Sequence, residues 1–190
     1  NNSIGLDFSL GHLYVDSNGK HADMPKYYQN SLEKLAKLTR KASKCKKGSK
    51  NYQKQKKHLA RVHEKVRNQR KDFHHKLSHT LAEQYDAIAV EDLNMKGMSR
   101  ALHLGKSTMD NGYGEFLGML RYKLEERGKK LVKIDRFYPS SKRCCCCGRV
   151  KEELKLSERI YICACGNNMD RDVNAAINIC DEGRRLLEAV

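Results

Sequence analysis

The sequence predicts an α/β fold in which helices are inserted between strands. Three observations lead to this class: short apolar runs of strand length, longer segments whose apolar residues recur every three or four positions, and turn sequences between them. With 190 residues, the chain is long enough to bury one substantial core and to carry one small appendage. It has no run of eighteen apolar residues and no signal-peptide core, which predicts a soluble, cytoplasmic protein with no membrane partner.

The first half of the chain predicts two short strands followed by two helices. Residues 4–8 and 13–15 are apolar runs, and the turn sequence Asp16-Ser17-Asn18-Gly19 closes the second. From about residue 29 the period becomes helical, and one face carries Leu32, Leu35 and Leu38. After a break at residues 46–49, a longer helix carries Leu59, Val62, Val66, Phe73, Leu77 and Leu81. These segments predict a basic helical hairpin, inserted at about residues 29–85, whose apolar seam packs inward.

The second half of the chain resumes the alternation of strands and helices. Residues 87–90 are fully apolar, as expected for a central strand buried on both faces. A helix that Gly128 stops follows, with apolar positions at Tyr113, Phe116, Leu117, Leu120 and Leu124. Residues 131–134 form the next predicted strand, and residues 171–187 contain a final amphipathic helix.

The positive charge is confined to the predicted hairpin. Residues 26–76 hold 18 Lys or Arg against three acids, which equals the net charge of +15 of the whole chain. Such a long basic stretch indicates a nucleic-acid partner more than a solvated helical face, which is the usual explanation of a short run. The candidate contacts in the hairpin are Lys44, Lys46, Lys47, Lys50, Lys54, Lys57, Arg61, Arg67 and Arg70. Beyond it, further candidates that could equally be ordinary surface charges are Arg136, Lys142 and Arg143.

Eight cysteines are present, and their spacing does not suggest a secreted disulfide scaffold. Cys144 and Cys147 form a CxxC pair before Gly148, and sixteen residues later Cys163 and Cys165 form a CxC pair before a second glycine. A structural Zn²⁺ site of four thiolates is the favoured interpretation, and free thiols are the alternative. The second pair is one residue short of the usual spacing, which leaves Cys145 and Cys146 open as substitutes. Cys45 and Cys180 lie far from both pairs in the sequence.

Acidic residues follow two of the predicted strands and open the last helix. Asp7 and Glu91 stand at strand ends, and Asp172 begins the helix. Since strand ends in an α/β sheet converge on one edge, these carboxylates are candidate ligands for two Mg²⁺ (or Mn²⁺) ions. Each acid also has an ordinary explanation, because Asp7 could satisfy a turn and Asp170 or Asp172 could cap the helix. Asp92 is the weaker candidate, because strand alternation points it to the opposite face from Glu91.

Four motifs, in this order, resemble the transposon-encoded TnpB (OrfB) family, which is related to compact type V CRISPR effectors. They are IGLDFSLGHLYVDSNG, AIAVEDLNMKGM, FYPSSKRCCCCG and ICACGNNMDRDVNAAINI, and the basic hairpin resembles the helical insertion of the family. The resemblance implies a RuvC (RNase H-like) mixed sheet, with a nuclease domain at residues 1–138 and 170–190 and a zinc ribbon at residues 139–169. It further implies catalytic roles for Asp7, Glu91 and Asp172, with zinc ligands at Cys144, Cys147, Cys163 and Cys165.

The resemblance also implies a function: RNA-guided DNA endonuclease activity by a two-metal mechanism, with a guide RNA and target DNA as partners. Family proteins carry an N-terminal half that has no counterpart here, so this chain is expected to lack that half of the same protein. Two other functions stay open. One is an RNA-guided DNA-binding repressor without cleavage activity, which the presence of all three acids disfavours. The other is a zinc-ribbon DNA-binding module or transposition accessory, which leaves the placement of Asp7 and Glu91 unexplained.

Overall fold

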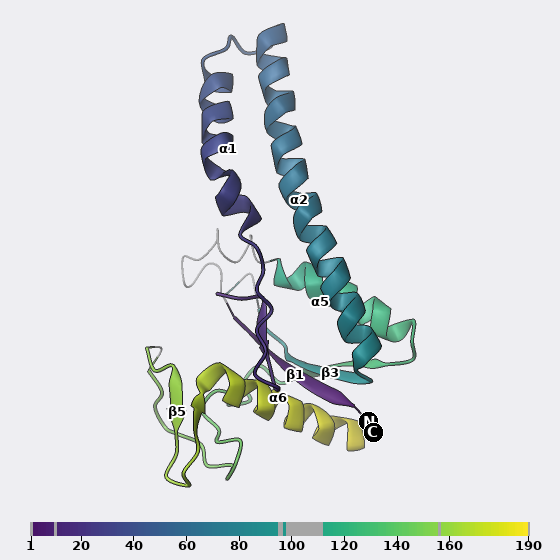
Figure 1. Cartoon of the computed structure of the whole chain (residues 1–190), viewed down its shortest axis with the longest axis vertical. Helices are drawn as coiled ribbons and strands as arrows, with labels where there is room; N and C mark the ends of the chain where they lie inside the picture. Colours follow the sequence, from purple (N-terminus) through teal and green to yellow (C-terminus); the bar gives the residue numbers. More distant parts are fainter. Residues whose placement is uncertain (1, 10, 95–96, 98–111, 156, 190) are drawn as a thin grey trace. The chain divides into compact units, whose positions relative to one another are not determined.

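A four-stranded mixed sheet forms the centre of the larger part of the protein, as Figure 1 shows for the computed structural model. Its strand order is β2-β1-β3-β4, with β1 (Ser3–Phe8) antiparallel to β2 (Tyr14–Asp16) and parallel to β3 (Ala87–Glu91), which is itself parallel to β4 (Lys130–Ile134). The structure describes residues 2–9, 11–94, 97, 112–155 and 157–189. The α/β class and the four predicted strands are therefore confirmed. Each strand end lies within one residue of its predicted position.

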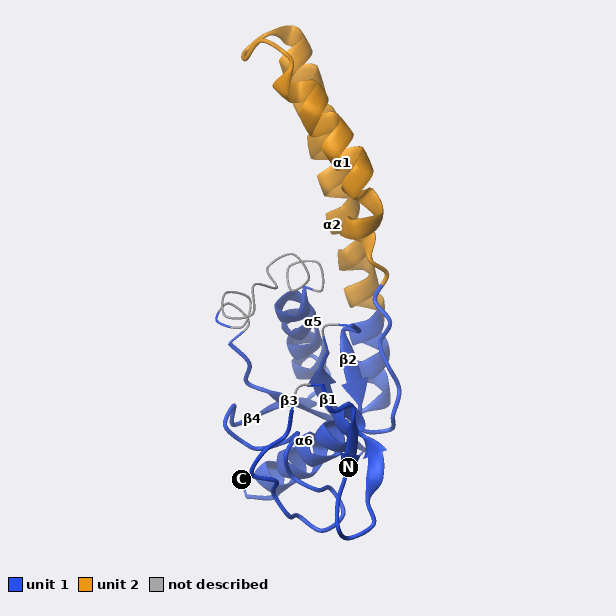
Figure 2. Ribbon diagram, turned by 90° about the vertical axis from the view of Figure 1, so that its left-hand side faces the viewer, with its two compact units in different colours: residues 1–24, 77–190 blue, residues 25–76 orange. Residues whose placement is uncertain are grey.

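The chain divides into two compact units, residues 1–24 with 77–190 and residues 25–76 (Figure 2). The second unit contains α1 (Tyr27–Ser43) and the first part of α2 (Lys50–Gln84), and the turn between them uses Gly48 at a φ of 83°. Leu35 and Val66 are buried in this unit. Leu32, predicted on the same seam, is 41% exposed, because a strict three-residue spacing drifts around the helix.

One face of the sheet is covered by α6 (Arg171–Glu188), which contacts β1, β3 and β4. Two glycines permit the close approach. A Cβ atom at Gly5 would lie 2.1 Å from the carbonyl oxygen of Ala176, and one at Gly183 would lie 2.4 Å from Cβ of Ala89. Farther along, Nε of Arg184 donates to Oγ of Ser3 at 2.6 Å. The helix therefore runs antiparallel to β1, so that its N-terminal end lies beside the C-terminal end of the strand.

The opposite face of the sheet packs against α5 (Tyr113–Glu125). Phe116, Leu120 and Leu124 are fully buried there, the Phe116 ring stacks on Tyr14 at 5.7 Å, and the Tyr113 ring lies 4.8 Å from Phe8. These residues belong to the predicted helical period. A sheet covered on both faces explains why β3 is apolar from Ala87 to Val90.

A second sheet of two antiparallel strands, β5 (Ile160–Ile162) and β6 (Asn168–Asp170), lies just before α6. Its small core consists of Cys144, Tyr161 and Cys163, and the Tyr161 hydroxyl donates to the carbonyl of Lys142 at 2.8 Å. Within the described residues, no helix has the length and apolar character needed to cross a membrane. The division into a nuclease domain and a ribbon at residues 139–169 stays a prediction.

Candidate functional site

Asp7 lies one residue before the end of β1, and Glu91 is the last residue of the neighbouring parallel strand β3. Leu6 pairs with Val90 in the register of β1 and β3, so the next residue of each strand is an acid at the same edge of the sheet. Because side chains alternate along a strand, Asp7 shares its face with Gly5, and Glu91 shares its face with Ala89. Gly5 and Ala89 both contact α6, so both carboxylates are on the α6 side.

Asp172 reaches the same place from α6. It stands one helical turn before Ala176, the residue that contacts Gly5, and this spacing sets it level with Asp7. The capping role belongs to Asp170 instead, whose Oδ1 accepts from the backbone N–H of Asp172 at 2.8 Å and of Val173 at 3.1 Å. The Asp172 carboxylate contacts Arg171 at 3.3 Å. Asp7, Glu91 and Asp172 together are called the acidic edge below.

Like charges are crowded at the acidic edge. Burial is the main cause that raises the pKa of Asp7 well above its ordinary value, and the carboxylates of Glu91 and Asp172 raise it further, while Arg171 partly offsets them. Burial also raises the pKa of Glu91, against the hydrogen bond from Ser140. A bound divalent cation would relieve both effects, and carboxylate oxygens are the ligands that Mg²⁺ prefers.

Asp92, the neighbouring acid, serves a different purpose. It pairs with Nζ of Lys133 at 2.7 Å and with Arg136 at 3.4 Å. The hydrogen bond from Lys133 is the main cause that lowers its pKa. Asp92 is therefore held in a surface ion-pair network, and its ranking behind Glu91 stays a prediction.

Four cysteines converge in the small sheet. The Sγ atoms of Cys144, Cys147, Cys163 and Cys165 all lie within 4.8 Å of one another, and in the described part of the chain this is the only such group of His, Cys, Asp or Glu. Sγ of Cys144 lies 3.6 Å from Sγ of Cys165, and Cys147 is equally far from Cys163. Tetrahedral Zn²⁺ with bonds of about 2.3 Å sets its sulfurs about 3.8 Å apart, whereas a disulfide requires about 2.05 Å. The donor set fits zinc, and the CxC spacing does not prevent closure.

Backbone amides prepare Cys144 to act as a thiolate. Burial alone would raise its pKa, but hydrogen bonds from the amides of Cys147 and Cys146 and from Nδ2 of Asn167 lower it to about 6. Gly148 and Gly166 follow the two pairs at φ values of 75° and 95°, which only glycine adopts without strain. Cys145 instead contacts Met169 at 3.6 Å, so the structure separates it from the group of four.

Four polar residues that were not predicted from the sequence join the cysteines, the acidic edge and α6. Nδ2 of Asn178 donates to the carbonyls of Ser140 at 2.8 Å and of Arg143 at 2.7 Å, and Nδ2 of Asn174 donates to Arg143 at 2.7 Å. The hydroxyl of buried Ser140 donates to the Glu91 carboxylate, while Nδ2 of Asn167 contacts Sγ of Cys144 at 3.4 Å. The sequence signal was present, because two asparagines one turn apart interrupt the apolar face of the last helix.

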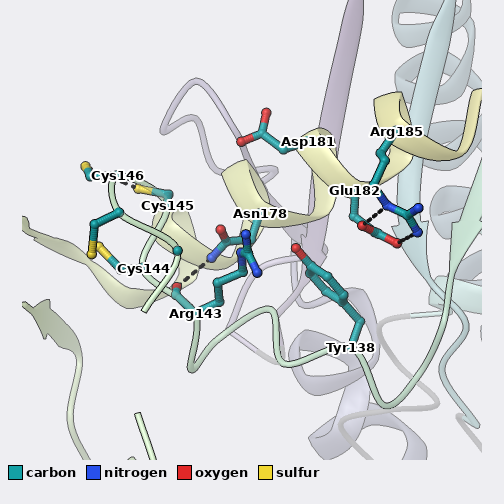
Figure 3. A pocket seen from close by; sticks show the side chains of 11 residues that line it. Tyr138, Arg143, Cys144, Cys145, Cys146, Asn178, Asp181, Glu182 and Arg185 are labelled. Atoms are coloured by element: carbon teal, nitrogen blue, oxygen red, sulfur yellow. Dashed lines mark hydrogen bonds and ion pairs between the residues drawn. The ribbon is translucent and has the colours of Figure 1, made fainter. Parts of the chain in front are cut away.

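A cavity of about 350 Å³ lies between the cysteine loop and α6, and Figure 3 shows the side chains around it. Asn178 lines it from the helix, and Tyr138 and Arg143 line it from the other side. The Glu182 carboxylate in its wall pairs with Arg185 at 2.6 Å, and this hydrogen bond lowers the pKa of Glu182. The cavity is thus polar, and the opposite charges of Glu182 and Arg185 in its wall neutralise each other.

The predicted nucleic-acid contacts differ in how free they are to bind. All nine in residues 44–70 are exposed except Arg70, which is half-buried. Arg136 is exposed but paired with Asp92. Lys142 donates to the carbonyl of Glu152 at 2.7 Å, and Arg143 lies against Gly148, so both serve the local fold. Nucleic-acid binding by these residues stays a prediction.

Comparison with known proteins matches both halves of the chain. Residues 1–102 match the family model OrfB_IS605, described as "Probable transposase", and residues 113–179 match the Cas12f1-like TNB domain. A "Putative RNA-guided DNA endonuclease" of Streptomyces pristinaespiralis is 38% identical over 181 residues, covering 95% of this chain and 45% of the relative. A relative of the same description, InsQ of Escherichia coli strain K12, is 32% identical over 200 residues, covering 97% of this chain and 50% of the relative.

The fold has a counterpart among solved structures. Cas12f1, in a cryo-EM complex with sgRNA and target DNA, superposes with a TM-score of 0.64 at 16% identity, over 94% of this chain and 49% of that one. This chain therefore spans about half the length of the relatives that it matches. The family match covers more than half of the chain and agrees with the four motifs in the sequence. The chain belongs to the OrfB (TnpB) family of probable transposases.

Proposed function

We propose that this chain is the RuvC-type catalytic region of an RNA-guided DNA endonuclease, and that Asp7, Glu91 and Asp172 form its hydrolytic centre. One observation carries the proposal: two strand-end carboxylates in register and a third from α6 lie at one edge of the sheet. Open α/β sheets bind their ligands at the carboxyl ends of strands. The names of the relatives from Streptomyces and Escherichia coli support the same class of activity.

In this proposal the acidic edge holds two Mg²⁺ or Mn²⁺ ions. Bound there, the ions would activate a water molecule and stabilise the leaving 3′ oxygen of the phosphodiester. The contribution of the chain itself is to position oxygen ligands: the Asp170 cap orients the first turn of α6, and Ser140 holds the Glu91 carboxylate by a hydrogen bond. Asp7 is half-buried, which limits the water that competes with its carboxylate for a bound ion.

We further propose that Cys144, Cys147, Cys163 and Cys165 hold one Zn²⁺ ion with a structural role. Four thiolates fill all four positions of tetrahedral zinc and leave none open for a substrate. Asn178 of α6 then connects this ribbon to the loop that carries Ser140, because its Nδ2 donates to the carbonyls of both Arg143 and Ser140.

The guide RNA and target DNA are proposed partners. In this proposal the basic unit of residues 25–76 binds the phosphates of the heteroduplex that guide and target form. Its exposed Lys and Arg side chains and its net charge of +15 support this role. The solved Cas12f1 complex contains both an sgRNA and a target DNA. Sequence would then be read by base pairing, with the protein recognising backbone and helical shape.

The hydrolytic centre is tested by measuring cleavage of single-stranded DNA in Mg²⁺. The wild-type chain is compared with the variants Asp7→Ala and Asp92→Ala. Asp7→Ala should reduce cleavage by about a hundredfold or more, the loss seen when one stabiliser of a transition-state charge is removed. Asp92→Ala is the matched control, because it removes an acid one residue beyond Glu91 that already has cation partners. It should cleave within about threefold of wild type, since exposed ion pairs contribute little.

The same proteins separate the competing functions. Asp7→Ala should keep its circular dichroism spectrum and its affinity for an RNA–DNA heteroduplex, and that affinity should fall steeply with salt. Full cleavage by folded Asp7→Ala protein would exclude the proposed centre. Heteroduplex binding by a wild-type chain that never cleaves in Mg²⁺ or Mn²⁺ would instead favour a non-cleaving, RNA-guided DNA-binding protein.

A further inference from the structure

Phe137 is the most exposed large hydrophobic residue in the described part of the chain, with 87% of its surface accessible. A phenylalanine at such a position gains almost none of the free energy that burial of its ring would give. It stands in the loop of residues 135–140, which leads from β4 to the cysteine ribbon.

Both ends of this loop are attached at Glu91. Ile134, the last residue of β4, is the register partner of Glu91, and the Ser140 hydroxyl donates to the Glu91 carboxylate. Phe137 is three residues from each of these anchors. The loop therefore spans the rim of the acidic edge, and the phenylalanine ring projects from its middle.

The loop is held by its own hydrogen bonds. Oδ1 of Asp135 accepts from the backbone N–H of Phe137 at 2.7 Å, and the Asp135 carbonyl accepts from Tyr138 at 3.1 Å. The Tyr138 carbonyl accepts from Ser140 at 2.8 Å. Because the turn is hydrogen-bonded on both sides of Phe137, the backbone that carries the exposed ring is held in place.

Two exposed cations stand near Phe137 in the chain. Arg136 precedes it directly, and Lys133 lies at the end of β4; both pair with the single carboxylate of Asp92. The side chains of Lys133 and Arg136 are 41% and 46% exposed, so both cations remain accessible to a ligand at this loop. This combination suits a nucleic-acid strand, since a base can stack on the ring while the adjacent phosphate meets the cations.

We propose that Phe137 is a stacking platform for an unpaired base of single-stranded DNA that enters the acidic edge. The inference rests on the proposed function and adds a residue that would position the substrate strand; the base on the ring must be unpaired, because a base in a duplex has both faces covered by its neighbours. Stacking would set the position of the strand relative to Glu91. Every base has a π-face, so this platform tolerates any sequence.

Affinity for a single-stranded oligonucleotide containing 2-aminopurine, measured by fluorescence in Mg²⁺-free buffer, tests the platform. Phe137→Ala should weaken binding roughly 5- to 100-fold, the range for losing one stacked base. Phe137→Trp should keep the affinity and the quenching of the base. The matched control is Ile162→Ala, which truncates another exposed apolar residue (59% accessible) on the ribbon strand β5. Ile162→Ala should bind the single-stranded oligonucleotide like wild type. Phe137→Ala should leave the affinity for duplex DNA unchanged.

The proposal is overturned if Phe137→Ala binds single-stranded DNA like wild type, if Ile162→Ala shows the same loss, or if only single-stranded RNA is affected. Lack of single-strand binding by the wild-type chain also overturns it. Hydrolysis is not needed for this measurement, so the two hypotheses fail separately. A wild-type chain that shows the stacking effect but does not cleave contradicts the endonuclease alone. A cleaving chain indifferent to Phe137→Ala contradicts the platform alone.

Discussion

At the scale of single residues, Asp7 is the side chain whose environment departs most from that of an ordinary surface acid. Burial is the main cause that raises the pKa of its carboxyl group, and the neighbouring carboxylates of Glu91 and Asp172 raise this pKa further. Such an arrangement is unfavourable to the folded protein unless a cation is bound, and it is typical of sites that serve a function and not stability.

Asp7→Asn should therefore stabilise the magnesium-free protein by about 1–2 kcal/mol at pH 7.5, within the common range of single substitutions. The sign follows from linkage: the unfolded chain releases this proton near pH 4, while the folded chain retains it to higher pH, so ionised Asp7 disfavours the folded state as pH rises. The gain should shrink as pH falls toward 5. Urea unfolding of both proteins from pH 5 to 8, in zinc-containing buffer, measures the difference.

Added Mg²⁺ provides the control for this prediction. It should stabilise the wild type and have little effect on Asp7→Asn, because the variant lacks one ligand. Equal stability of the two proteins across the whole pH range would show that Asp7 carries no electrostatic strain.

At the scale of elements, α6 performs three tasks along its length. It carries Asp172 in its first turn, it binds the ribbon loop through Asn174 and Asn178, and it packs on the sheet where glycines remove side chains. The distance between helix and sheet is set by Gly5, whose missing Cβ makes room for the Ala176 carbonyl. The position of Asp172 beside Asp7 thus depends on a residue with no side chain.

Gly5→Ala should destabilise the protein by about 3 kcal/mol, because overpacking against a backbone carbonyl forces the helix away from the strand. Gly118→Ala is the matched control: Gly118 is exposed on α5, and an added Cβ meets nothing within 4 Å. That change should stabilise the helix by about 0.5–1 kcal/mol. Chemical denaturation of both variants tests the pair, and a Gly5→Ala protein as stable as wild type would contradict the close packing.

At the scale of the whole molecule, the acidic edge and the cysteine ribbon belong to one compact unit, while the net charge belongs to the other. The link inside the first unit is short: Asn178 binds the Ser140 carbonyl, and the Ser140 hydroxyl binds Glu91. Loss of zinc should therefore reach the acidic edge through the loop between them.

Cys147→Ser should lose the bound zinc and raise the Mg²⁺ concentration needed for half-maximal cleavage, because the loop that holds Ser140 loses its anchor. Cys146→Ser, which changes the exposed neighbour outside the group of four, should keep one zinc per chain. Ser140→Ala should keep zinc and show only the raised Mg²⁺ requirement. Elemental analysis with Mg²⁺ titration distinguishes these cases, and zinc retained by Cys147→Ser but lost by Cys146→Ser would refute the ligand set.

Much of the fold could be predicted because its signals are local. Apolar runs such as residues 87–90 and the helical period around Phe116 and Leu120 are properties of neighbouring residues. The prediction that Leu32 lies on the buried seam was wrong. Which residues face the seam between two helices depends on how far their spacing drifts around the helix over several turns. Ser140 and Asn178 could not be assigned a partner, since the groups they bind lie 49 and 38 residues away.

By itself, the sequence determined the α/β class, the confinement of net charge to residues 26–76, the candidate acids and the two pairs of cysteines. These follow from residue type, spacing and periodicity, which need no knowledge of the fold. Only the tertiary structure decided that Asp170, not Asp172, caps α6, that a CxC pair closes the group of four thiols, and that Ser140 joins Glu91 to the ribbon. Each of these depends on contacts between segments far apart in the chain, and such contacts exist only after the sheet, the helix and the ribbon have packed.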